Sequence, residues 1–154
     1  PMPNLLISRT WATIGEYSRA VQAARTALKD GPTDPYMYGN LGVMLYRNKQ
    51  YDEALPILKL AVRGGTTDDG TQITGLPLDY GRVAEYYYVY GLAQARVGDC
   101  GEVLQIARLL REGVPDDTTS TDNADAMEQI CQERANGTAT PTATGESAEV
   151  TPTP

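Results

Sequence analysis

The chain has 154 residues, an apolar content of 41% and a formal net charge of −7, and it contains neither His nor Phe. The length suits a single domain, and no apolar run approaches the roughly 20 residues that a membrane-spanning helix needs. Residues 117–154 hold seven of the 20 acidic residues and one of the 13 basic ones, and a nearly neutral body with an acidic end argues against nucleic acid or an anionic membrane surface as a partner.

The first half of the chain is expected to form two pairs of helices. Apolar residues at helical spacing predict these helices over residues 2–14, 17–29, 36–47 and 51–63. Gly31 and Pro32 end the second helix, while Asp34 caps the third and Pro35 occupies its first position. Each helix of a pair follows the other after a short turn, which predicts antiparallel hairpins.

The second half opens with a long glycine-rich segment, residues 64–83, which we expect to be a loop with a short extended piece at residues 72–74. Three further helices are predicted over residues 84–97, 100–112 and 119–134. The last is acidic and suits the polar terminal helix that a stacked array requires. Residues 135–154 are rich in Thr and Pro and cannot bury enough apolar surface to order themselves, so we expect a disordered tail.

A repeat of 34 residues relates the first two pairs. Tyr17, Ala20 and Ala27 recur as Tyr51, Ala54 and Ala61. A period of this length is typical of helix-turn-helix solenoids, in which neighbouring hairpins must stack to bury their apolar faces.

The second pair carries the most specific pattern: an aromatic residue, Leu-Gly, and a later small residue, at Tyr38, Leu41-Gly42 and Ala54. In this pattern the chain resembles the tetratricopeptide repeat family over about residues 1–116. The resemblance implies an all-α, right-handed solenoid domain over residues 1–134, followed by the tail, 135–154. Its repeats would span about 1–34, 35–68 and 84–117, with the loop 64–83 inserted and residues 119–134 as a capping helix.

Small residues are expected where the two helices of each hairpin cross. At the crossings stand Ser8, Gly42 and Gly91, with Ala20, Ala54 and Val103 facing them across the hairpins. A larger residue at a crossing would force the helices apart at a cost of about 1–3 kcal/mol. The alternative is an unrelated bundle of Ala-rich helices.

The resemblance also implies a concave groove, lined by the first helix of each pair, that holds an extended peptide. Its expected lining is Leu5, Arg9, Ala12, Thr13, Tyr36, Asn40, Val43, Tyr46, Arg47, Tyr88, Leu92, Ala95 and Arg96. Asn40 matches a family position whose amide often holds a peptide backbone. We expect Arg9, Arg47 and Arg96 to be unpaired on this face, which favours binding. The alternative is that the tyrosines of this set only cover the core.

One subgroup of the family clamps acidic chaperone C-termini with Lys, Arg and Asn. Here Leu5, Glu85 and Val89 stand where that clamp needs polar or basic groups, so we do not expect a chaperone adaptor.

Cys100 and Cys131 begin one predicted helix and end another, and these ends should be adjacent in an antiparallel stack. They are a candidate disulfide, the alternative being two buried thiols. A disulfide predicts an extracytoplasmic domain, and its absence would favour the cytoplasm. Thr-Pro runs in the tail resemble linkers of secreted bacterial proteins. Because the chain starts at Pro1 rather than Met, we expect a mature or excised segment.

No set of residues predicts catalysis, and we expect no catalytic residue, metal or cofactor. Asp68-Asp69-Gly70 lacks the spacing of a calcium loop. The sequence therefore predicts a non-catalytic scaffold that binds a protein or peptide, or a subunit of a larger complex, with the loop 64–83 as a second contact. The alternatives are an extracytoplasmic region or accessory subunit of a membrane-bound bacterial enzyme such as a sugar polymerase or ligase, a filament or surface-layer subunit, and a hydrolase with an unrecognised site.

Overall fold

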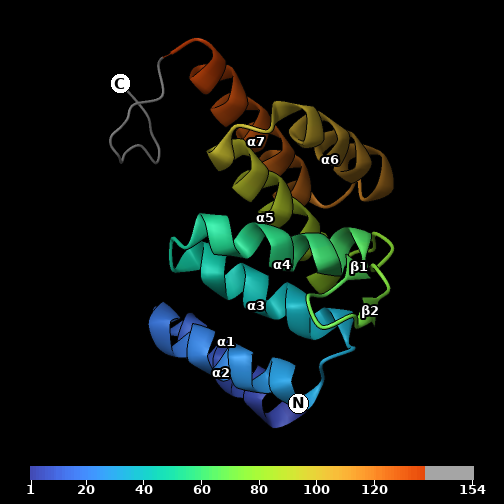
Figure 1. Cartoon of the computed structure of the whole chain (residues 1–154). Coiled ribbons are helices and arrows are strands. Elements are labelled where there is room, and N and C mark those ends of the chain that lie inside the picture. The colour runs from blue at the N-terminus through green and yellow to red at the C-terminus, as the bar shows by residue number, and fades with distance from the viewer. Residues whose placement is uncertain (138–154) are drawn as a thin grey trace.

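The computed structural model describes residues 1–137, so the expected disorder of the tail lies almost wholly outside the described residues. Within residues 1–137 the chain forms seven helices and one short β-hairpin (Figure 1). The helices are α1 (Met2–Thr13), α2 (Tyr17–Asp30), α3 (Pro35–Arg47), α4 (Tyr51–Arg63), α5 (Arg82–Val97), α6 (Cys100–Gly113) and α7 (Thr118–Ala135). Each begins and ends within two residues of the bounds expected from the sequence.

The helices are arranged as three stacked antiparallel pairs with α7 at the far end (Figure 1). One apolar cluster runs through the stack, from Ala24 on α2 through Leu41 on α3 and Tyr90 on α5 to Met127 on α7. Because this interior is continuous, each pair is covered by its neighbour, as a helical solenoid requires. The all-α solenoid predicted from the sequence is confirmed. No helix among residues 1–137 is long and apolar enough to cross a membrane.

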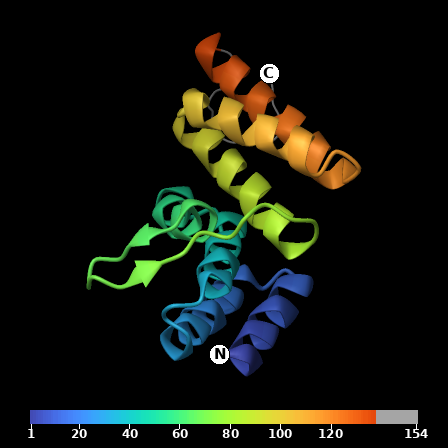
Figure 2. The same ribbon diagram turned by 90° about the vertical axis from the view of Figure 1, so that its right-hand side faces the viewer.

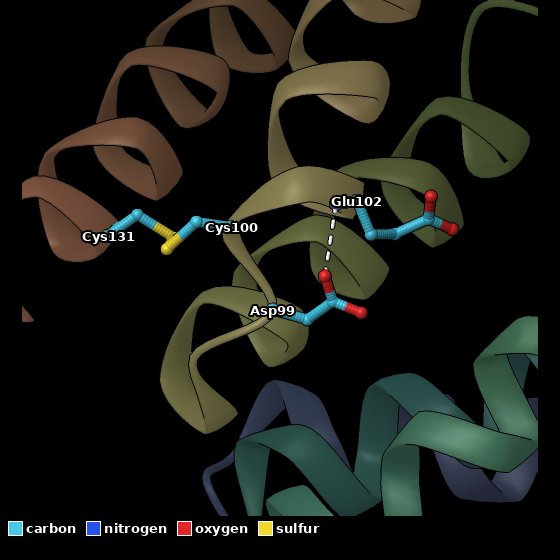
Figure 3. Close-up of a disulfide and its surroundings, with 4 residues drawn as sticks. All are labelled: Asp99, Cys100, Glu102 and Cys131. Carbon is cyan, nitrogen blue, oxygen red and sulfur yellow. Dashed lines mark hydrogen bonds between the residues drawn. A yellow bond between two sulfur atoms is a disulfide. The ribbon is translucent and has the colours of Figure 1, made fainter. Parts of the chain in front are cut away.

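Local signals in the sequence set the helix ends. The Asp34 carboxylate accepts a hydrogen bond from the Tyr36 backbone N–H at 2.9 Å and so caps α3. The Asp99 carboxylate accepts one from the Glu102 N–H at 3.2 Å and caps α6 (Figure 3). Gly98 ends α5 in the left-handed region, at φ 91°, where a side chain would be strained.

The helix crossings are tight, as the small residues predict, but two of the three facing residues differ from those expected. Ser8 is fully buried and donates a hydrogen bond to the Ala20 carbonyl at 2.8 Å. A Cβ on Gly42 would run into the side chain of Leu58, which lies one turn beyond Ala54.

The third crossing is closed partly by the last helix. A Cβ on Gly91 would lie 2.5 Å from the sulfur of Met127 on α7 and 3.0 Å from Ile106 Cγ2 on α6. The expected facing residues Ala54 and Val103 are fully buried in the core. We had assigned the facing role by analogy with Ser8 and Ala20, and the larger Leu, Ile and Met side chains reach the glycines instead.

The inserted segment contains a hairpin that the sequence did not predict. β1 (Gly65–Thr66) pairs antiparallel with β2 (Gln72–Ile73), and the hairpin projects from the side of the stack (Figure 2). Its base is fixed to the body: Ile73 is buried against Tyr38 and Ala61. The expected extended piece is thus one strand of a hairpin.

The end of the loop is held to α5. The Tyr87 hydroxyl donates a hydrogen bond to the Leu76 carbonyl at 2.6 Å, and the Leu76 N–H donates one to the Ala61 carbonyl at 2.8 Å. The loop therefore fills the gap between α4 and α5 and adds to the core.

Cys100 and Cys131 form a disulfide with their Cα atoms 5.7 Å apart (Figure 3). Cys100 is the first residue of α6 and Cys131 lies in the last turns of α7. The bond therefore ties the terminal helix to the third pair.

Candidate partner-binding groove

A pocket of about 240 Å³ lies where the first helices of the three pairs meet. We call it the arginine pocket, and it is lined by Arg9, Ala12, Thr13, Met44, Arg47, Arg82 and Glu85. Three residues come from α1, two from the last turns of α3 and two from the first turn of α5. The stacking of the pairs therefore creates this pocket, since no single repeat contains it.

The lining has an excess of positive charge, with three guanidinium groups against one carboxylate. Glu85 pairs with both Arg47 and Arg82, each at 3.0 Å, and its side chain is only 15% exposed. Arginine stays protonated at every physiological pH. Two positive charges are thus left without a carboxylate inside the pocket.

Arg9 has the least compensated charge. It makes no ion pair within residues 1–137, and its Nε is buried without a hydrogen-bond partner in that part of the chain. Its guanidinium lies beside the Tyr86 hydroxyl. Burial raises the pKa of Tyr86 to about 12, although the nearby positive charge of Arg9 opposes the shift. Tyr86 therefore stays neutral at pH 7 and supplies no counter-charge.

The structure divides the expected groove residues into three groups. Arg9, Ala12, Thr13 and Arg47 line the arginine pocket. Leu5, Asn40, Val43 and Ala95 are instead buried, with 4%, 2%, 2% and 0% of their surface exposed. Tyr36 is 41% exposed and its ring contacts that of Tyr86, while Tyr88 and Leu92 are half-buried against the core.

The expectation that Arg47 and Arg96 are unpaired was wrong. Arg47 pairs with Glu85, and Arg96 donates a hydrogen bond from Nε to the Tyr46 hydroxyl at 3.1 Å. Arg96 also lies over the ring of Tyr51, 5.4 Å from its centroid. Tyr46 and Arg96 thus form a separate cluster at the other end of α3. Residue spacing alone does not show which acceptors a neighbouring helix brings close.

Sequence reasoning missed the contribution of Arg82, which was assigned to the loop, and of Met44. Glu85 had been considered only as an obstacle to a chaperone clamp. The spacing of Arg82 and Glu85 by three residues is a signal for an ion pair within one helix turn, and it would have extended α5 to Arg82.

Residues 12–69 match a protein-family model described as tetratricopeptide repeat. The chain carries tetratricopeptide repeats. The matched segment runs from the end of α1 through α4 into the loop, and α5, α6 and α7 extend the same stack beyond it. No curated protein matches the chain.

Tetratricopeptide repeats generally mediate protein–protein interaction or scaffolding, and they are typically non-catalytic. The chain is therefore assigned to a family of protein-binding modules. Among residues 1–137 no group of three or more Asp, Glu or Cys side chains is placed to hold a metal ion.

Proposed function

We propose that this tetratricopeptide repeat domain is a non-catalytic scaffold whose arginine pocket binds an acidic segment of a partner protein. The observation that carries the proposal is the charge of Arg9, which lacks a carboxylate partner within residues 1–137 and lies in a pocket with two further arginines. A glutamate or aspartate side chain entering the pocket would supply the missing acceptor.

The pocket is suited to a carboxylate on geometric grounds as well. Guanidinium groups bind carboxylates through directional, charge-assisted hydrogen bonds, which are about twice as strong as neutral ones. Met44, Ala12 and the Thr13 methyl group provide apolar walls for the stem of such a side chain. Glu85 holds Arg47 and Arg82 in place, so that the donors are ordered before the ligand arrives.

Fluorescence anisotropy with a labelled peptide of alternating Glu and Ala tests the proposal. We expect the full chain to bind this peptide and not the same peptide with Gln for Glu. Arg9→Gln and Arg47→Gln should each weaken binding about 5–10-fold, because the pocket is partly open to water.

The matched control is Arg25→Gln. Arg25 is an exposed arginine that pairs with Glu53 outside the pocket, so its loss changes the net charge by the same amount. Equal weakening by all three substitutions would reduce the effect to overall charge and refute the pocket. Binding that does not fall between low and high salt would also contradict a charge-based site.

We further propose that the domain works outside the cytoplasm, as an extracytoplasmic region or subunit of a larger bacterial assembly. The disulfide between Cys100 and Cys131 supports this, because such bonds persist mainly in oxidising compartments. Thiol alkylation followed by intact mass, on protein from its native host, tests it. Two alkylated thiols without added reductant would contradict the proposed compartment.

A further inference from the structure

We infer that the C-terminal segment 138–154 occupies the arginine pocket of its own chain and competes there with partner peptides. This inference rests on the proposed function, because both ligands would use the same pocket. The first support is charge. The pocket has two guanidinium groups in excess, while residues 135–154 contain Glu146 and Glu149 and neither Lys nor Arg.

The second support is reach. The ends of α5 and α7 lie together, since a Cβ on Gly98 would be 3.3 Å from Arg134 Nη2. With a rise of 1.5 Å per residue, Arg82 at the start of α5 is about 24 Å from that point. Extended chain covers about 3.3 Å per residue, so the nine residues from Gly137 to Glu146 span about 30 Å. Both carboxylates can therefore reach the pocket.

The third support is the chemistry of the segment. Pro141 removes a backbone donor and restricts φ, so fewer conformers of the free segment are lost on binding. The segment has no large apolar residue to bury beyond Val150, so the carboxylates are its main means of recognition. This is the chemistry that the pocket selects.

Tethering makes such weak contacts sufficient. A linker of this length holds its ligand at an effective concentration of about 1 mM or more. Two partly exposed carboxylate–arginine contacts give an affinity of that order, so the pocket would be occupied for a substantial fraction of the time and still open to a stronger partner. The segment would then set a threshold that a partner's acidic peptide must exceed.

The test uses the full chain with Glu146→Gln and Glu149→Gln combined. The matched control combines Glu112→Gln with Asp116→Asn, which removes the same charge from exposed positions of the body. We expect the tail variant to bind the Glu-Ala peptide about 2–10-fold more tightly than the unchanged chain, and the control to bind as the unchanged chain does. The Nε–Hε resonances of Arg9 and Arg47 should shift in the tail variant alone, at every protein concentration.

The outcomes separate this inference from the proposed function. Equal peptide affinities and unchanged arginine resonances in the tail variant would overturn the inference while the proposed function stands. Shifted resonances in a chain that binds no acidic peptide would support the inference and refute the proposed function. Shifts that grow with protein concentration would assign the segment to the pocket of a second copy and overturn the assignment to its own chain.

Discussion

Asn40 donates a hydrogen bond from Nδ2 to the Ser8 hydroxyl at 3.2 Å, and both side chains are buried. Ser8 in turn donates to the Ala20 carbonyl at 2.8 Å. A polar chain therefore joins α3, α1 and α2 inside the first interface between repeats. The family resemblance implied that Asn40 holds a peptide backbone, but in this chain its amide holds a neighbouring helix.

Asn40→Ala should consequently reduce stability and leave binding intact. Removing the buried donor deprives Ser8 of a partner, and we expect the free energy of unfolding to fall by about 1–3 kcal/mol. Urea unfolding followed by circular dichroism measures this change. The affinity of the folded fraction for the Glu-Ala peptide should stay the same.

The control is Asn4→Ala, which removes an exposed hydrogen bond to Asp30 and should change stability by less than about 0.5 kcal/mol. Full stability of Asn40→Ala together with lost peptide binding would return Asn40 to the groove.

Gly42→Ala should separate α3 from α4. Its new Cβ would run into Leu58, which is fully buried and has little room to move. We expect a loss of about 1–3 kcal/mol in the free energy of unfolding, measured by urea denaturation.

Gly101→Ala is the matched control, because Gly101 is also helical but a Cβ there would meet nothing closer than the Asp99 carboxylate at 3.7 Å. This substitution should be neutral or stabilise by up to about 1 kcal/mol, as Ala favours helix. A Gly42→Ala variant as stable as the parent would show that the crossing is looser than described.

The architecture could be predicted from the sequence because its signals are local. Helical periodicity, the Asp34 cap and the stops at Gly31 and Gly98 each act within one turn, and the 34-residue repeat places the pairs. The site was less predictable because it depends on contacts between distant segments. Arg47 meets Glu85 across 38 residues, and no local rule links these positions. The hairpin was missed for the same reason, since strands of two residues are held by Tyr38 and Ala61 rather than by their own pattern.

The disulfide should anchor α7. It closes a loop of 31 residues, for which the chain-entropy model gives about 3–4 kcal/mol. We expect Cys100→Ser combined with Cys131→Ser to lower the free energy of unfolding by about that amount, and amide hydrogen exchange in α7 to accelerate more than in α3.

Reducing the unchanged chain should have the same effect as the double substitution, and reductant should leave the double variant unaffected. Equal exchange in α7 with and without the bond would show that packing of Met127 and Ala124 alone holds the helix.

Glu102 should make stability depend on pH, because its carboxylate joins three helices. It accepts two hydrogen bonds from Arg63 of α4, at 2.8 and 2.9 Å, and one from the Tyr90 hydroxyl of α5 at 2.7 Å. The hydrogen bonds from Arg63 lower the pKa of Glu102, against the opposing effect of burial, and the bond from Tyr90 lowers it further. A lowered pKa in the folded state means that folding favours the ionised form.

The stabilisation by Glu102 is therefore complete above the unfolded-state pKa of about 4.3 and is lost as the pH falls through the lower folded-state pKa. Glu102→Gln should cost about 1–3 kcal/mol at pH 7, where it leaves Arg63 without its carboxylate, and the difference from the parent should shrink as the pH falls below 4. Urea unfolding at a series of pH values measures this. Glu112→Gln, at an exposed position on the same helix, should show a small effect that is the same at every pH. A deficit in Glu102→Gln that persists unchanged at pH 3 would mean that its shape, rather than its charge, holds the three helices together.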